Sequence, residues 1–289
     1  MASLKEVKGR IASVNSTRKI TSAMKMVASA KLHKAQAAIE SMLPYERRLH
    51  HILTEFYEQL YRGDVSLFIV KREVKKRWLS WCLLPIPVCA AGFNANVIRH
   101  LVDLLAEYKP LGLENILVFP VGKKVADAVR KLGFRIEGDF QHMADKPSYQ
   151  EAADLAADLM KRFLHGDVDK VELLYNHFKS TASQILTRET YLPIDLNNEK
   201  KEEERTIDYI LEPSAEELMQ EMLPKVLRMK MFTVLLDSNA AEHAARTMAM
   251  QIATDNANEL LQELTVMYNK SRQQSITNEL LDIVGGSMA

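Results

Sequence analysis

The last quarter of the chain predicts one very long helix. Residues 225–284 contain neither glycine nor proline, and Gly285-Gly286 ends the run. Glycine costs about 1 kcal/mol in a helix interior and proline about 3 kcal/mol, so an uninterrupted helix is permitted after Pro224. At a rise of about 1.5 Å per residue this helix is roughly 90 Å long, which is far more than the diameter of a globular domain. It therefore needs a partner helix.

The N-terminal stretch supplies a partner, because apolar residues recur there at the spacing of a coiled coil. The first seam residues lie three or four positions apart: Leu4, Val7, Ile11 and Val14. We expect a slip of three residues at Thr17, which overwinds a supercoil locally. The seam then resumes with three further apolar residues: Ile20, Met24 and Val27. A core helix of a globular domain is the alternative interpretation.

Amphipathic spacing continues beyond Pro44 and stops at Gly63-Asp64. Proline removes one ladder hydrogen bond and crowds the preceding turn, so Pro44 can kink this segment. The pattern predicts one helix from Leu4 to Tyr61.

Between the two long helices, short apolar runs alternate with amphipathic stretches. Apolar runs lie at 66–70 and 78–88, and strands are predicted at 115–121, 170–178 and 183–193. Helices are predicted at 96–108, 123–132 and 149–164. Gly133 and Gly166 close the last two helices. This alternation is typical of an α/β layer domain with a partly parallel sheet.

Charge is balanced overall, with 38 basic and 38 acidic residues, so composition predicts no general attraction to nucleic acid or acidic membranes. The distribution is uneven. Residues 1–40 hold eight bases and two acids, a net charge of +6, whereas residues 197–223 hold nine acids and three bases, a net charge of −6. Polarised segments suit an elongated protein that touches different partners along its length.

Two cysteines, Cys82 and Cys89, form neither a disulfide framework nor a zinc spacing, which fits a reducing compartment. The start of the chain lacks signal-peptide character, and no apolar run approaches the ~20 residues that span a bilayer. We therefore expect a protein on the cytosolic side that reaches a membrane only through partners.

Sequence motifs for catalysis are absent. There is no G-x-G-x-x-G, and Gly122-Lys123-Lys124 lacks the first glycine and the Ser or Thr of a phosphate-binding loop. The eight histidines are scattered, and Glu242-His243 lacks the second histidine of a zinc peptidase. We expect no catalytic residue, no cofactor and no metal site in this chain.

Both ends of the chain resemble one family. Residues 3–36, SLKEVKGRIASVNSTRKITSAMKMVASAKLHKAQ, closely resemble the N-terminus of the γ subunit of F-type ATP synthases. Residues 240–286, AAEHAARTMAMQIATDNANELLQELTVMYNKSRQQSITNELLDIVGG, resemble its C-terminus. Residues 209–236, which begin YILEPSAEELMQEMLPKVL, extend the match. One stretch departs: the family's Ser-Asp-Arg-Gly-Leu-Cys-Gly is replaced at 84–91 by LPIPVCAA, so contacts of that loop cannot be carried over.

The resemblance implies a fold and a role. The fold class would be α/β, with a long antiparallel α-helical coiled coil formed by the N- and C-terminal helices, plus a central Rossmann-like α/β domain. The coil would be the shaft inside the hexameric ring of alpha and beta subunits. The α/β domain would contact the epsilon subunit and the c-subunit ring. Such a chain is the non-catalytic rotor of a proton-translocating ATP synthase, peripheral on the cytoplasmic side of a bacterial inner membrane.

Four parts are expected along the chain: an N-terminal coiled-coil helix at 1–62, the α/β domain at 63–196, a charged linker or foot at 197–213 and a C-terminal coiled-coil helix at 214–289.

Partner contacts are implied for eight residues that match family motifs: Met24, Lys25, Tyr209, Glu212, Arg246, Arg272, Gln273 and Thr277. The last three lie in RQQSIT, which faces the alpha and beta subunits in the family. Tyr209 and Glu212 correspond to the foot near the c ring. Each of these residues can also be explained without a partner subunit. Most would then be solvated side chains, Met24 would pack within the protein, and Glu212 would stabilise a helix N-terminus.

Two other functions stay open on the residues alone. One is a stand-alone coiled-coil adaptor with an α/β head, and the other is a nucleotide-dependent enzyme with long helical arms. Co-purification with alpha and beta subunits separates a rotor from an adaptor, and nucleotide binding by the isolated chain favours an enzyme.

Overall fold

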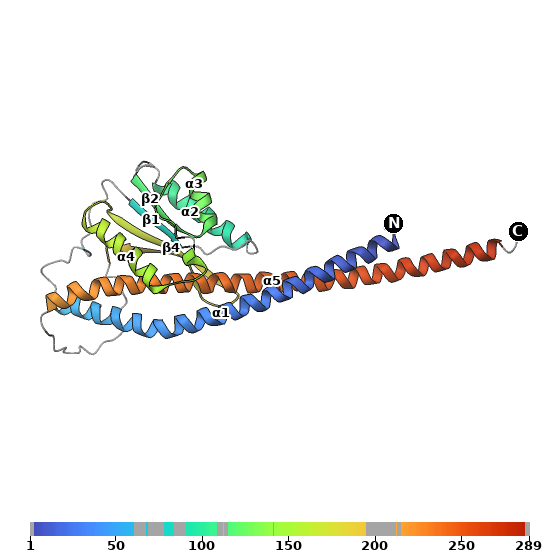
Figure 1. The fold of residues 1–289 in the computed structure, drawn as a ribbon, viewed down its shortest axis with the longest axis horizontal. Coiled ribbons are helices and arrows are strands. Elements are labelled where there is room, and N and C mark those ends of the chain that lie inside the picture. The colour runs from blue at the N-terminus through green and yellow to red at the C-terminus, as the bar shows by residue number, and fades with distance from the viewer. Residues whose placement is uncertain are drawn as a thin grey trace. The chain divides into compact units, whose positions relative to one another are not determined.

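The computed structural model describes residues 3–60, 68, 78–83, 91–108, 112, 115–140, 142–194, 212 and 215–286. The chain divides into two compact units. The helical unit comprises Met1–Ala30 and Arg246–Ala289, and the α/β unit comprises Lys31–Ala245. Two helices, α1 (Leu4–Leu60) and α5 (Ala215–Gly286), contribute to both units (Figure 1).

The α/β unit is built around a five-stranded sheet with the strand order β3-β2-β1-β4-β5. The strands are β1 (Trp78–Leu83), β2 (Ile116–Val121), β3 (Arg135–Ile136), β4 (Lys170–Phe178) and β5 (Gln184–Leu192). The first four strands are parallel, and β5 runs antiparallel to β4. The intervening helices are α2 (Ala91–Tyr108), α3 (Lys123–Lys131) and α4 (Tyr149–Leu164). The predicted α/β domain with a partly parallel sheet is confirmed.

Helices cover both faces of this sheet (Figure 1). Side chains of a strand alternate between faces, so β2 contributes to two cores. One core joins β2 and β4 to α2 and α3: Leu101, Ile116, Val118, Val125, Val129 and Leu174. The opposite core joins β2 and β4 to α4 and α5 and includes Phe119, Val121, Leu159, Phe163, Leu173, Met231 and Leu235. The sheet is therefore the middle layer of three, and α5 belongs to one outer layer.

The elements differ from the sequence expectations mainly at their ends. Gly133 and Gly166 follow α3 and α4 with φ angles of 81° and 77°, the left-handed conformation that glycine adopts most easily. The helix α2 begins five residues earlier than expected, at Ala91 rather than 96. The two-residue strand β3 is too short to give a periodic signal. The expected apolar runs at 66–70 and 84–88 lie outside the described residues, apart from Phe68.

Both long helices continue through a proline. Pro44 lies inside α1, and Pro224 lies inside α5, which begins at Ala215 rather than after that proline. Each proline removes one ladder hydrogen bond. Leu223, directly before Pro224, and Val226, two residues after it, are buried, so packing offsets the lost bond there.

Within the α/β unit, α1 and α5 run antiparallel. A late residue of α1 packs with early residues of α5: Leu53 with Met219, Leu223 and Val226. Earlier residues of α1 pack with later ones of α5: Leu32 and Ala35 with Ala240 and Ala244. The alanines let the two backbones approach closely at this end of the unit.

One ammonium group joins both helices to the sheet. Lys230 Nζ on α5 lies 3.0 Å from Glu189 Oε1 on β5 and 3.6 Å from Glu46 Oε1 on α1. The Tyr175 hydroxyl donates a hydrogen bond to the other oxygen of Glu189 at 3.1 Å. Burial alone would lower the pKa of Lys230, but the two carboxylates outweigh burial and raise that pKa above its ordinary value. Lys230 therefore stays charged and ties three elements together.

In the helical unit, polar contacts fix the pairing of α1 with α5. Arg18 Nη1 donates to Asn258 Oδ1 at 3.3 Å, and the hydroxyl oxygens of Thr21 and Thr254 lie 2.9 Å apart. A step of three residues forward on α1 thus corresponds to a step of four residues back on α5. The two helices are antiparallel here too.

The predicted slip of the seam is wrong. The expected seam residues Ile20, Met24 and Val27 are 58%, 39% and 59% exposed. Buried and half-buried positions of α1 instead include an unbroken alternation of four and three residues: Val14, Arg18, Thr21, Lys25 and Ala28. The heptad spacing therefore continues without overwinding.

The polarity of the seam residues explains why the hydropathy pattern predicted the wrong seam. A heptad seam normally holds apolar residues, and here Arg18, Thr21 and Lys25 occupy three successive seam positions. Arg18 is tolerated because its guanidinium donates to Asn15 Oδ1 at 3.0 Å as well as to Asn258. The three apolar residues that were expected in the seam each precede a true seam residue by one position, so they lie on the neighbouring, exposed face.

We expect Ala28→Gln to lower the free energy of unfolding by about 2 kcal/mol, because a longer polar side chain must enter a closed seam. Ala28 is 1% exposed. The matched Val27→Gln variant, on the exposed face, should change stability by less than about 0.5 kcal/mol. Urea unfolding of the full chain, followed by circular dichroism, measures both. Equal destabilisation of the two variants would contradict the unbroken seam.

Lys230→Met should cost on the order of 3 kcal/mol at neutral pH, because it leaves Glu46 and Glu189 half-buried without their cation. A base with a raised pKa contributes its stability below its unfolded pKa, so the wild-type advantage should persist until the pH rises through about 10.5 and beyond. The control is Lys225→Met, which removes an exposed pair with Glu221 and should cost less than about 0.5 kcal/mol. Identical unfolding curves for the two variants would refute the stabilising role of Lys230.

Candidate interaction surfaces

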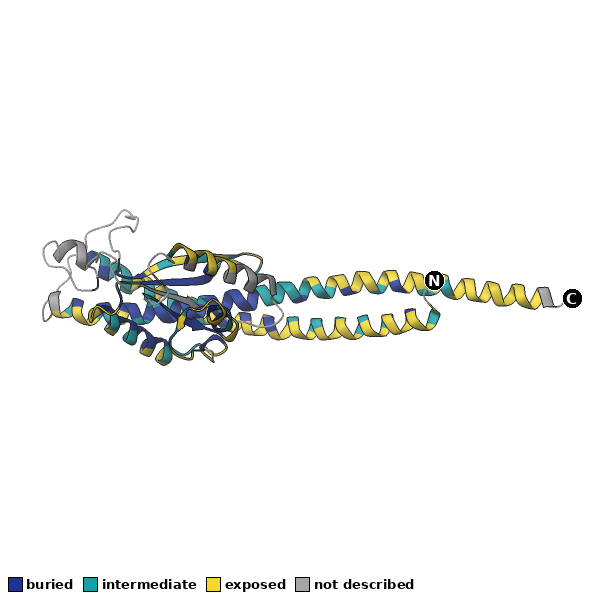
Figure 2. Ribbon diagram, turned by 90° about the horizontal axis from the view of Figure 1, so that it is seen from above, coloured by how far each residue is buried: buried dark blue, intermediate teal, exposed yellow. Residues whose placement is uncertain are grey.

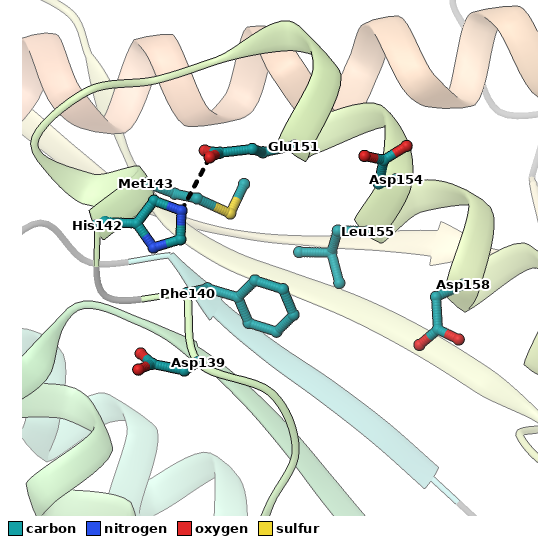
Figure 3. Close-up of a pocket in the computed structure, with 8 residues that line it drawn as sticks. All are labelled: Asp139, Phe140, His142, Met143, Glu151, Asp154, Leu155 and Asp158. Atoms are coloured by element: carbon teal, nitrogen blue, oxygen red, sulfur yellow. Dashed lines mark hydrogen bonds and ion pairs between the residues drawn. The ribbon is translucent and has the colours of Figure 1, made fainter.

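The α/β unit has a hollow of about 320 Å³ between α4 and the segment around the 3₁₀ helix η3 (His142–Ala144). Its lining combines four carboxylates with one histidine and three apolar residues (Figure 3): Asp139, Phe140, His142, Met143, Glu151, Asp154, Leu155 and Asp158. His142 Nε2 lies 2.9 Å from Glu151 Oε1. None of the eight lining residues is lysine or arginine, so this hollow repels the phosphates of a nucleotide.

A nearby arginine is committed to the protein itself. Arg162 donates to Asp158 at 2.9 Å and to Glu137 at 2.8 Å. Burial alone would raise the pKa of Glu137, but hydrogen bonds from Arg162 and Arg135 outweigh it and hold that pKa below its ordinary value. Glu137 therefore stays ionised, and Arg162 serves as a structural partner rather than as an anion ligand.

The eight residues singled out from the sequence fall into separate groups. Met24 and Lys25 lie on α1 in the helical unit, where Met24 is exposed and Lys25 is half-buried in the seam. Arg246 is half-buried on α5. Glu212 is exposed, and Tyr209 lies outside the described residues.

The RQQSIT segment lies on the most exposed part of α5. Arg272, Gln273 and Thr277 are all exposed, and the Thr277 hydroxyl donates to the carbonyl oxygen of Gln273 at 2.9 Å. Every residue from 272 to 284 is exposed (Figure 2). Five of them are large and apolar: Ile276, Leu280, Leu281, Ile283 and Val284. An exposed apolar surface of this kind is typical of a site that binds another molecule.

Sequence reasoning missed a second kind of surface, a polar notch in the seam of the helical unit. Its lining is Arg18, Lys19, Ser22, Thr254 and Asn258. The missed signal was the occurrence of Arg18 and Thr21 at four- and three-residue intervals after Val14. Thr17 and Ile20 were expected in the seam, whereas Arg18 and Thr21 are its members.

Two further findings concern only the described residues. Among them, no three His, Cys, Asp or Glu side chains are grouped so as to hold a metal ion. No helix in the same part of the chain combines the length and the hydropathy needed to cross a membrane.

Comparison with known proteins gives a consistent result. The sequence profile described as ATP synthase matches residues 3–289. The ATP synthase gamma chain of Phocaeicola vulgatus is 76% identical, with both chains covered completely, and that of Bacteroides fragilis is 61% identical over the same coverage. The gamma chain of Parabacteroides distasonis is 48% identical, with 99% of each chain covered.

Solved structures resemble the fold at low sequence identity. A chain of the Euglena gracilis mitochondrial ATP synthase, from a structure of its OSCP, F1 and c-ring, superposes with a TM-score of 0.62 at 20% identity. That superposition covers 99% of this chain and 93% of the other. A chain of the Tetrahymena thermophila central stalk and c-ring superposes with a TM-score of 0.56 at 19% identity, covering 81% and 99%.

Antiparallel helices with a fully exposed segment at 272–284, and an α/β domain whose hollow disfavours phosphate, are typical of a subunit that binds other proteins. The comparisons specify which one. The chain belongs to the ATP synthase gamma chain family and is thus a subunit of ATP synthase.

Proposed function

We propose that this chain is the non-catalytic central rotor shaft of a proton-translocating F-type ATP synthase. The observation that carries the proposal is the exposed C-terminal end of α5, where residues 272–284 present apolar and hydrogen-bonding side chains to another molecule. In the family, that molecule is the ring of alpha and beta subunits. The α/β domain would contact the epsilon subunit and the c-subunit ring.

The chain would act by biasing conformations rather than by chemistry. Rotation of the c ring turns the shaft, and each beta subunit then meets a different side of it. A contact surface can shift a neighbouring site only if it binds the states of that site with different affinity. The exposed face of α1 with Ile20, Met24 and Val27 differs chemically from the polar notch beside it, which supplies the required asymmetry.

Three groups of residues would divide the contacts. Arg272, Gln273 and Thr277 would grip the inner wall of the ring, where an arginine can form paired hydrogen bonds with a carboxylate. Met24, Lys25 and Arg246 would meet projecting loops of the ring, and Tyr209 and Glu212 would belong to the foot near the c ring. Residues 1–62 and 214–289 would form the shaft. Residues 63–196 would form the head, and residues 197–213 the foot.

The shaft must also be fastened to the head. Lys230 links α5 to β5 and α1, and the buried Tyr191 hydroxyl donates to the carbonyl oxygen of Leu227 at 2.8 Å. These bonds would resist sliding between helix and sheet when torque is applied. The complex would sit at the cytoplasmic side of a bacterial inner membrane, and this chain would be peripheral to it.

Purification of the chain from its own cells tests the proposal. A rotor should co-purify with alpha and beta subunits in a large ATPase that couples ATP hydrolysis to proton pumping. A chain recovered without these subunits would support the alternative, a stand-alone coiled-coil adaptor with an α/β head.

Arg272→Ala should lower ATP-driven proton pumping by about tenfold, the effect of losing one charge-assisted hydrogen bond. Fluorescence quenching of a pH-sensitive dye in inverted membrane vesicles measures this pumping. Lys270→Ala removes a cation two residues away on the same exposed helix and should leave pumping unchanged. Normal pumping by the Arg272 variant would exclude a gripping role for this residue.

A further inference from the structure

One carboxylate fastens the end of β4 to α5. Asp237 Oδ1 on α5 accepts a hydrogen bond from the backbone N–H of Phe178 at 2.8 Å, and Asp237 Oδ2 lies 2.6 Å from His177 Nδ1. These three residues form the β4–α5 joint. Leu236, directly before Asp237, belongs to the larger apolar core, and Phe178 also packs against the cluster that includes Ala240. The joint is therefore a polar contact between two apolar clusters along α5.

The two side chains of the joint differ in their access to water. His177 is 51% exposed, whereas Asp237 is 13% exposed. Burial raises the pKa of Asp237 above its ordinary value, although hydrogen bonds from His177 and the Phe178 backbone oppose this rise. The negative charge of Asp237 is therefore only partly compensated, while the imidazole beside it exchanges protons with the solvent.

A hollow of about 190 Å³ adjoins the joint, between α1, the end of β4 and α5. It is lined by eight residues: Gln36, Ile39, Glu40, Leu43, His177, Phe178, Thr233 and Asp237. Of these eight, only His177 can carry a positive charge. The Thr233 hydroxyl donates to the carbonyl oxygen of Met229 at 3.0 Å, so it does not compensate Asp237. The hollow leaves space into which the imidazole can move when its bond to Asp237 weakens.

Other described titratable groups near the joint lie on each element around it. They are Glu40 and Glu46 on α1, Tyr175 on β4, Glu189 on β5 and Lys230 on α5. Among these five groups Lys230 is the cation, and its ammonium lies 3.0 Å from Glu189 and 3.6 Å from Glu46. Its charge is thus shared by two other carboxylates, and the charge balance at Asp237 depends on the proton of His177.

The presence of histidine in the joint makes this balance depend on pH. A lysine or arginine would stay charged at every physiological pH, whereas imidazole side chains ordinarily exchange a proton at about pH 6.5. A hydrogen bond from histidinium to a carboxylate is roughly twice as strong as one from neutral imidazole. The extra strength is present below that pH and is lost as the pH rises through it.

We propose that the β4–α5 joint is a proton-sensitive switch, which holds the sheet to α5 tightly when His177 is protonated and loosely when it is neutral. In the neutral state Asp237 keeps the bond from Phe178 but loses its cation, so the end of β4 separates from α5 more often. In a rotor, the fastening of head to shaft would therefore follow the pH around the α/β domain. That consequence rests on the proposed function, whereas the switch itself is a property of this chain alone.

Hydrogen exchange at the Phe178 amide tests the switch, because this N–H donates to Asp237 and exchanges when the joint opens. The full chain is incubated in deuterated buffer at about pH 6 and about pH 8, and fragmentation by electron transfer in a mass spectrometer resolves single amides. After correction for the intrinsic effect of pH on exchange, the protection of Phe178 should fall about fivefold between the two conditions. The Leu174 amide, in the middle of β4, should keep its protection.

His177→Gln removes the titration but keeps a side chain that can donate a hydrogen bond. Its Phe178 protection should match the wild-type value at the higher pH and show no fall between the two conditions. His142→Gln is the matched control, because His142 also pairs with an acidic residue, Glu151, at 2.9 Å in the same unit. This variant should keep the fall seen in the wild type.

The possible results are distinct. Equal wild-type protection of Phe178 at the two pH values overturns the switch, as does a fall that persists in His177→Gln or disappears in His142→Gln. A fall of the same size at Leu174 indicates a loss of global stability and also overturns the switch. None of these results depends on co-purification with alpha and beta subunits, so failure of the switch leaves the proposed function standing.

Discussion

The antiparallel pairing of α1 with α5 is the constraint on which the fold depends. Its contacts join distant parts of the chain: Thr21 and Thr254 are 233 positions apart, and Arg18 and Asn258 are 240 apart. Everything between them, including the whole sheet, is one closed loop. Closing such a loop costs entropy before any seam contact forms. The α/β domain offsets part of that cost, since its own cores hold a segment of each of the two helices.

A single helix serves two different environments. In the α/β unit, residues 231–236 and 238–244 of α5 are buried on every side, because α1, α4 and the sheet surround them. Two polar residues there form hydrogen bonds: Asn239 donates to the carbonyl oxygen of Ala144 at 2.8 Å, and Thr233 donates to that of Met229 at 3.0 Å. In the helical unit, only one stripe of α5 is buried. The width of the apolar stripe thus follows the number of neighbours.

Long-range periodicity made most of the fold predictable. The absence of glycine and proline after Pro224 predicted a continuous α5, and alternating strand and helix patterns predicted the parallel sheet. The seam beyond Val14 was not predictable from hydropathy, because Arg18 is held there by Asn15 and Asn258, and the second of these lies on the other helix. Burial of a polar side chain depends on partners that spacing alone does not identify. The contact roles came from family resemblance, whereas the notch needed both helices in place.

The exposed end of α5 also affects how a cell handles the free chain. Leu280, Leu281 and Ile283 are exposed at an end of α5 that no other described part of this chain covers. In an unassembled copy these side chains face water, where they favour self-association and capture by chaperones and proteases. Partners that cover this end therefore protect the copy from removal. We therefore expect the abundance of the chain to follow the supply of its partners.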